Sequence, residues 1–262
     1  MRALAAFAGM IPKLFLAYRL WVWMDFFVRI FSLTVFYYFW NAVYAGGGDI
    51  RGLSLAQTLN YILLAQILSP LVQSRLPMVM GRLVREGDVG IELLRPVDFQ
   101  SRWYAECMGV SATMIVIQIP LVIIACVCFE MHLPSDPRVW AVFAVTVWLG
   151  QAVVFLFDWM FSCLVFYTTE VWGLWVLREG VAAFFSGALV PLQFMPEWLE
   201  RICRAMPFAQ ALYVPVSILS GIAPVSDAPR LWLIQIAWIV GLGILSRTFF
   251  GVAIRKVTVQ GG

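Results

Sequence analysis

Residues 107–129 read CMGVSATMIVIQIPLVIIACVCF and contain no Asp, Glu, Lys or Arg over 23 positions. An α-helix needs about 20 apolar residues to cross the hydrocarbon core of a bilayer. This stretch is long enough to cross, and it has no charge that would hold it at the surface. It predicts a transmembrane helix, so the solvent around this part of the chain is lipid rather than water.

Five further segments on either side are also mostly apolar; the first two carry no charge, and the other three are each interrupted by one or two charged residues. They lie between Arg29 and Asp49, between Arg51 and Arg75, from Val139 to Thr169, from Val171 to Met195 and from Leu231 to Ile254. The chain is 62% hydrophobic and 13% charged, whereas soluble domains are about 45–50% apolar and roughly 25% charged. The sequence therefore predicts an all-α integral membrane protein with six transmembrane helices, forming one domain over residues 1–262. The start of the fifth span is not fixed by this pattern.

Two further segments are not predicted to be spans. Residues 1–20 place Arg2, Lys13 and Arg19 among apolar side chains, which predicts an amphipathic helix lying in the membrane interface rather than a secretory signal. Residues 190–221 are polar and interrupted by prolines, so we expect a re-entrant helical pair on the external side, between spans five and six.

Lysine and arginine set the orientation, because cytoplasmic loops carry an excess of them. With the N-terminus inside, 13 of the 18 fall in cytoplasmic segments. Both termini are therefore expected in the cytoplasm.

The expected cytoplasmic connection after span two, residues 78–102, is the richest polar element. Charged and apolar residues alternate in it, and Gly87 and Gly90 permit tight turns. The candidate contact residues are Arg82, Arg85, Glu86, Asp88, Glu92, Leu93, Leu94 and Arg95. Two interpretations stay open, a docking surface for a soluble partner and a solvated connector.

Polar residues inside the spans are the second candidate set. Gln66, Gln118 and Gln151 lie in spans two, three and four, where amides either line a substrate path or join helices. Asp158 is the one charge in span four. A charge in the bilayer must face protein, water or an ion partner, so Asp158 either forms a structural pair or takes part in transport.

The motifs of catalysis and nucleotide binding are absent from the sequence. The two lysines, Lys13 and Lys256, are not in the Gly-Lys-Ser/Thr context of a Walker A loop. The chain has one histidine and five cysteines, and their spacing does not match that of a metal site. We expect no catalytic, cofactor or metal site in this chain, and no enzyme activity of its own.

Two stretches carry a family resemblance that covers essentially the whole chain. These are GDVGIELLRP at residues 87–96 and GALVPLQFMPEWL at residues 187–199, continuing to Met206-Pro207-Phe208 and Ser220-Gly221. Together with the order of the spans, they resemble the membrane subunit of type-2 ATP-binding-cassette (ABC) exporters, in a subfamily of small six-span bacterial permeases.

The resemblance implies partners and roles. Such a permease pairs with a second permease, identical or related, and docks separate ATPase subunits that hold ATP and Mg²⁺. The connection 78–102 would be the coupling loop, and the re-entrant pair would close an external gate at Pro191, Pro196, Trp198 and Pro207. The location would be the bacterial inner membrane, with no nucleic-acid partner. The aromatic residues of the spans suggest an amphipathic or hydrophobic cargo, and a polar cargo stays open. A stand-alone secondary transporter is the main alternative, although it would often show an internal repeat and none is evident. A membrane enzyme would need a catalytic cluster.

Overall fold

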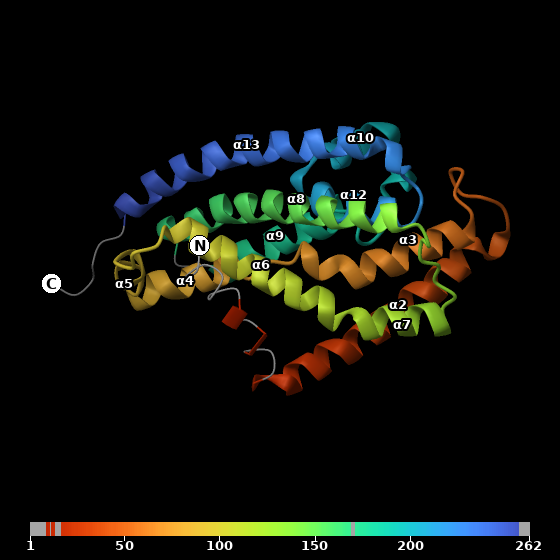
Figure 1. Cartoon of the computed structure of the whole chain (residues 1–262), viewed down its shortest axis with the longest axis horizontal. Helices are drawn as coiled ribbons and strands as arrows, with labels where there is room; N and C mark the ends of the chain where they lie inside the picture. Colours follow the sequence, from red (N-terminus) through yellow and green to blue (C-terminus); the bar gives the residue numbers. More distant parts are fainter. Residues whose placement is uncertain (1–8, 11, 14–16, 169–170, 257–262) are drawn as a thin grey trace.

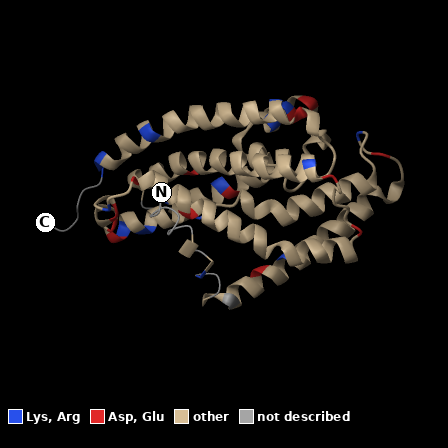
Figure 2. Cartoon of the chain, viewed as in Figure 1, with Lys and Arg blue, Asp and Glu red and all other residues tan. Residues whose placement is uncertain are grey.

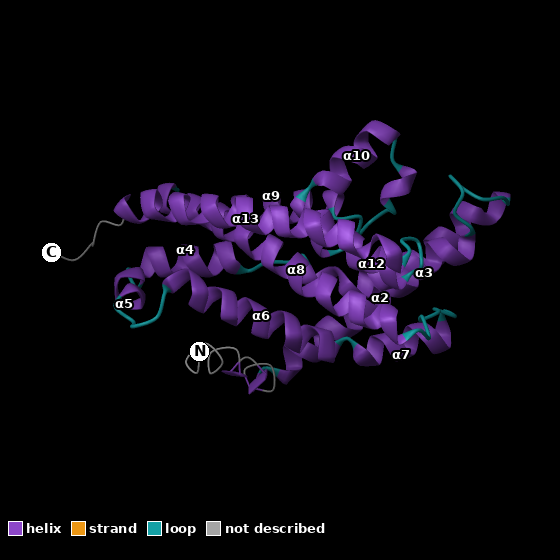
Figure 3. Cartoon of the chain, turned by 45° about the horizontal axis from the view of Figure 1, so that its top comes forward, coloured by secondary structure: helices purple, strands orange, loops and turns teal. Residues whose placement is uncertain are grey.

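The computed structural model describes residues 9–10, 12–13, 17–168 and 171–256, and the elements in this part are helical (Figures 1 and 3). The α-helices are α2 (Arg19–Val43), α3 (Leu55–Leu68), α4 (Leu76–Glu86), α5 (Val89–Leu93), α6 (Phe99–Ile117), α7 (Ile119–Cys128), α8 (Pro137–Ser162), α9 (Val171–Phe185), α10 (Glu197–Ala205), α11 (Pro207–Ala211), α12 (Tyr213–Leu219) and α13 (Ala228–Ala253). The 3-10 helices are η1 (Tyr44–Gly46), η2 (Ser69–Leu71), η3 (Cys163–Tyr167), η4 (Leu192–Phe194), η5 (Val225–Asp227) and η6 (Ile254–Lys256). The predicted interfacial helix, residues 1–20, lies mostly outside the described residues.

Five helical segments in the described part are long and apolar enough to cross a membrane. They are Leu20–Gly46, Leu55–Glu86, Phe99–Cys128, Pro137–Tyr167 and Val225–Lys256. A sixth candidate is the helix pair Glu197–Ala205 and Pro207–Leu219, which is bent by 68°. The prediction of an all-helical membrane protein with a bent pair near its C-terminus is confirmed. The helix at the expected fifth span, α9, has 15 residues. It is about 22 Å long, less than the ~30 Å hydrocarbon core.

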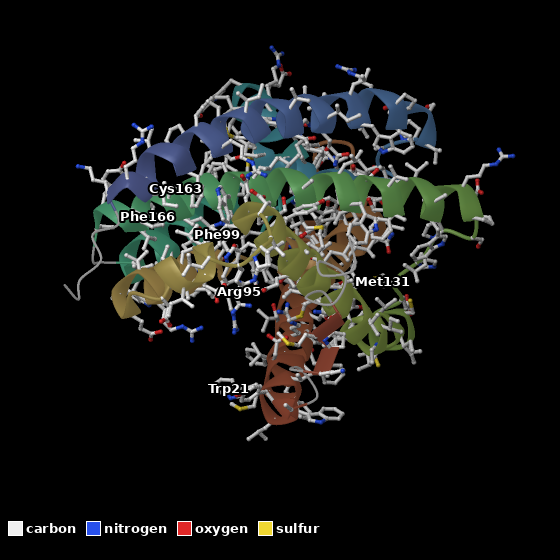
Figure 4. The ribbon with its side chains drawn as sticks, turned by 60° about the vertical axis from the view of Figure 1, so that its left-hand side comes forward. Trp21, Arg95, Phe99, Met131, Cys163 and Phe166 are labelled. Atoms are coloured by element: carbon white, nitrogen blue, oxygen red, sulfur yellow. The ribbon has the colours of Figure 1, made fainter. Side chains whose placement is uncertain are left out.

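The helices run between two ends of the molecule (Figure 1). One end carries α5, and we call it the α5 end; the other carries α10 and the start of α3, and we call it the α10 end. Most charged residues gather at these two ends, and the length between them is largely uncharged (Figure 2). Helix α2 stands apart, with Trp21 at its free end (Figure 4), because it packs mainly on α3.

Buried apolar side chains form two separate clusters. The larger, which we call the outer core, is centred on α3 and α12, and it includes Tyr61 to Ala65, none more than 2% exposed. The smaller, which we call the inner core, lies toward the α5 end, and its members are Leu76, Met80, Phe99, Trp103, Phe155, Trp159, Cys163 and Ala253. Phe99 and Cys163 of the inner core are labelled in Figure 4.

The bent segment is packed into the bundle rather than laid on its surface. Every residue of α11 and α12 is buried, and Pro207 opens α11, where its missing N–H costs no hydrogen bond. On α8, Gly150 allows the close approach: a Cβ there would lie 2.5 Å from the Gln210 carbonyl oxygen and 2.7 Å from the Ala211 Cα. Both are backbone atoms, so they cannot swing aside as a side chain would.

Replacing Gly150 by alanine is therefore expected to push α11 away from α8 and to destabilise the protein by about 1–3 kcal/mol, the usual cost of overpacking. The measurement is unfolding in mixed micelles followed by tryptophan fluorescence. Gly243→Ala on α13 is the matched control, because a Cβ there meets nothing within 4 Å. An equal loss of stability in both variants would contradict the close-packing argument.

Candidate coupling surface and buried polar network

The expected connection 78–102 is a compact helical turn. Helix α4 ends at Glu86 because Gly87 adopts φ +78°, a left-handed conformation that glycine takes without strain. The Asp88 N–H then donates to the Leu83 carbonyl at 3.0 Å, which satisfies one of the free carbonyls at the end of α4. The five-residue helix α5 follows directly. This cap fixes the direction in which α5 leaves α4.

Helix α5 has a buried face and an exposed apolar face. Val89 is 1% exposed, and Leu93 is half-buried against the inner core. By contrast, Ile91 is 64% exposed and Leu94, directly after the helix, is 85% exposed. The sequence singled out Leu93 and Leu94 but missed Ile91. The i, i+3 spacing of positions 91 and 94 is the signal that places both on one side of a helix.

An ion network ties α5 to the start of α6. Glu92 pairs with Arg95 at 2.9 Å and with Arg102, and Arg102 also pairs with Glu106 at 3.0 Å. Arg102 is 8% exposed and lies over the Trp103 ring. Glu92 therefore fixes the angle between α5 and α6. The sequence analysis missed Arg102, because no local pattern shows that a basic residue ten positions after Glu92 forms an ion pair with it.

The remaining predicted residues of this surface divide by exposure. Arg82, Arg85 and Glu86 are exposed on α4, and Arg95 is exposed after α5, while Asp88 is half-buried in the turn. Arg95 lies near the α5 end in Figure 4. Exposed charges thus flank the exposed apolar pair Ile91 and Leu94.

A second ion pair joins α6 to α13 at the same end. Arg247 donates to both carboxylate oxygens of Asp98, at 2.6 and 2.9 Å. Asp98 is also the N-cap of α6, because its carboxylate accepts the Ser101 backbone N–H at 2.8 Å. The hydrogen bonds from Arg247 are the largest cause that holds the pKa of Asp98 well below its ordinary value.

This shift gives a pH dependence with a definite sign. A carboxyl whose pKa is lower in the folded state stabilises the fold above its unfolded pKa, about 4, and loses that contribution as the pH falls. Asp98→Asn keeps a capping side chain but removes the charge. We expect it to melt slightly below the wild type at pH 7, with the gap shrinking as the pH is lowered below 4. A gap that stays constant between pH 7 and pH 3 would contradict the assignment. The pair is half exposed, so the effect is small.

The charge in span four has a buried partner. Asp158 on α8 is 2% exposed and Arg178 on α9 is 1% exposed. Their contact is bidentate, with both N–O distances 2.8 Å, and Arg178 also contacts Glu179 at 2.9 Å. The sequence left a structural pair and a transport role open for Asp158. The structure places Asp158 in a pair, and Arg178 is the partner that sequence reasoning did not identify.

Two of the three predicted glutamines join helices. Gln66 donates to the Ala188 carbonyl at 2.8 Å and accepts from Ser32. Gln151 donates to the Leu71 carbonyl at 2.7 Å and accepts from Ser111. Gln118 differs: it is 3% exposed at the junction of α6 and α7, and within the described residues neither of its amide atoms has a hydrogen-bond partner.

The four predicted gate residues lie along one segment and differ in exposure. Pro191 precedes η4 and Pro207 opens α11, and both are buried. Pro196 precedes α10 and is exposed, and Trp198 on α10 is 65% exposed. The described residues contain no group of His, Cys, Asp and Glu side chains that could hold a metal.

A comparison with protein families places these features in a known group. Residues 30–261 match the family model described as ABC-2 family transporter protein. No curated protein matches the chain.

Proposed function

Because the chain belongs to the ABC-2 transporter family, we propose that it is the membrane subunit of an exporter whose ATPase is a separate protein docked on α5. The family and the apolar helices make the chain a multi-pass membrane permease. The observation that supports the docking site is the exposed apolar pair Ile91 and Leu94 on a rigid helix at the α5 end. Exposed apolar groups rimmed by charge mark interaction sites.

The rigidity of the turn supports a coupling role. Gly87 closes α4, and Glu92 fixes α5 to α6 through Arg102. If the closed ATPase dimer favours one of two states of the helix bundle, its closure shifts the bundle toward that state. A rigid contact between the ATPase and α5 would transmit this shift as a tilt of the helices. Arg82, Arg85 and Arg95 would add charge contacts at the rim. ATP and Mg²⁺ would be bound by the ATPase, since this sequence has no Walker A motif.

A second permease, identical or related, would complete the translocation path. Helix α2 supports this: it exposes Trp21, Phe27 and Phe31, with 64–70% of each side chain uncovered, and such a face suits lipid or a partner helix. The positive-inside count supports an orientation with the α5 end and both termini in the cytoplasm of a bacterial cell and the re-entrant segment outside. The cargo would be amphipathic or hydrophobic.

The test is a tagged pull-down in mild detergent from the native host, followed by mass spectrometry. We expect a soluble protein with a Walker A motif at near one-to-one stoichiometry, together with the second permease if the two differ. Recovery of the chain alone, intact in several detergents, would contradict the proposal and favour a stand-alone secondary transporter.

A further inference from the structure

The second span is broken in its middle. The segment Leu55–Glu86 is apolar and long enough to cross the membrane, yet η2 ends at Leu71 and α4 begins at Leu76. A break frees backbone N–H and C=O groups that a continuous helix would pair. In a membrane such groups must find partners within the protein.

Side chains from α8 and α9 supply those partners. Gln151 donates to the Leu71 carbonyl at 2.7 Å, and Arg178 donates to the Val72 carbonyl. At Ser74, the carbonyl accepts the Trp175 indole N–H at 2.8 Å, and the N–H donates to the Glu179 carboxylate at 3.1 Å. One face of α9 (Trp175, Arg178 and Glu179) therefore holds the break in place. A break with its own set of partners is a built feature of the fold.

Arg178 is the residue on which these contacts meet. Its guanidinium holds Asp158 on α8, Glu179 on its own helix and the Val72 carbonyl in the break. It also lies 5.3 Å from the centre of the Phe208 ring, on α11 of the bent segment. A single buried cation thus contacts α8, the break in span two and the segment at the α10 end.

The break also coincides with the boundary between the two apolar cores. The outer core takes in Leu71, just before the break, and Val72, its first residue, and the inner core begins with Leu76, just after it. The half of span two on the outer side is anchored to the turn after α9, because Tyr61 donates to the Gly187 carbonyl and Gln66 to the Ala188 carbonyl. The half on the inner side carries α5.

We propose that residues 72–75 form a hinge between α3 and α4, and that Arg178 is the positioning residue that sets its angle and links it to the bent segment. When α4 and α5 tilt as one piece, the Val72 carbonyl must move relative to Arg178. Its other contacts, with Asp158 and Phe208, then carry the movement to α8 and α11. The part that this hinge plays in transport rests on the proposed function, whereas the hinge itself does not.

The experiment measures two spin-label distances by pulsed electron paramagnetic resonance on the permease alone in lipid nanodiscs. The five native cysteines are replaced by alanine. One label pair, at Arg85 and Arg255, reports on the α5 end, and the other, at Ala56 and Arg138, reports on the α10 end; all four residues are exposed. The variants are Arg178→Lys, which keeps the charge but loses the planar fork, and D158N/R178Q, which removes both charges together. Arg201→Lys is the control, because the pair of Arg201 with Glu197 is about 80% exposed.

In both Arg178 variants we expect the width of the distance distribution at the α5 end to at least double, while the distribution at the α10 end keeps its wild-type width. In the Arg201→Lys control, the distributions at both ends should keep the wild-type width. An unchanged α5-end distribution in both variants would overturn the proposal. Equal broadening at the two ends would also overturn it, since Arg178 would then hold the fold as a whole. The same conclusion follows if neither variant yields monodisperse protein while the control does.

A second readout uses the complex with its ATPase. Arg178→Lys should still co-purify with the ATPase, because its side chain is buried away from α5. Its rate of ATP hydrolysis, however, should lie either above or below the range of wild-type preparations. An unchanged rate would contradict the role in coupling. Failure to capture any ATPase would count against the proposed function only, since the distance measurement needs no partner.

Discussion

Arg178→Met is expected to lower the free energy of unfolding by about 3–5 kcal/mol, because it leaves Asp158 buried without a counter-charge. Asp158 is 2% exposed and has two contacts of 2.8 Å to Arg178. The variant also removes the donor to the Val72 carbonyl, which adds the cost of an unsatisfied buried acceptor, about 1–3 kcal/mol. The measurement is equilibrium unfolding in mixed micelles titrated with sodium dodecyl sulfate.

The double variant D158N/R178Q separates charge from packing. Removing both partners of a buried ion pair costs much less than removing one, and the two amides can still donate to nearby acceptors. We expect the double variant to recover more than half of the stability that Arg178→Met loses. A double variant as unstable as the single one would show that the two charges are not coupled. Arg201→Met should change little, because its ion pair is exposed.

Replacing Ile91 and Leu94 together by aspartate is expected to abolish co-purification of the ATPase. Truncating one buried interface anchor typically costs at least ~2 kcal/mol, or roughly 25-fold in Kd, and a charge placed against an apolar pocket costs more. Both side chains point away from the inner core, so the fold should survive. The measurement is the ratio of ATPase to permease in a pull-down at fixed detergent and salt.

A control of the same chemistry lies at the other end of the molecule. Ile202 on α10 is 42% exposed, and Ile202→Asp should leave the ratio at the wild-type value. Size-exclusion chromatography of each variant checks that the permease is folded. If the double aspartate variant elutes as wild type and still captures the ATPase within twofold, α5 is not the docking helix.

Several elements of this protein could be predicted from the sequence because they depend on local composition. Charge-free runs such as 107–129 give the spans, since about 20 apolar residues suffice to cross the bilayer. The prolines of 190–221 predict a bent pair, because proline removes a backbone donor and interrupts a helix. Gly87 predicts the turn before α5, where the backbone takes a positive φ.

The contacts that make up the candidate site are of another kind. Asp158 and Arg178 are 20 positions apart, and Asp98 and Arg247 are 149 apart. No local pattern says which acid meets which base, because the choice depends on how α8, α9 and α13 rotate and pack. The same holds for the break at residues 72–75. Pro70 and Pro77 flank this break and predict a kink in the span. However, no local pattern shows that its backbone groups find their partners on Gln151, Trp175, Arg178 and Glu179.

The sequence by itself therefore determined that this chain is an integral membrane protein, where five of its apolar spans lie and which connection is rich in charge, because hydropathy and backbone preference act over one helix length. The tertiary structure alone decided that Leu93 packs against the inner core while Ile91 and Leu94 stay exposed. It also decided that Glu92 pairs with Arg102, and that the buried Arg178 contacts the break in span two. These features depend on the partner that each polar or apolar group finds when distant helices pack, since a buried charge or carbonyl is stable only beside its complement.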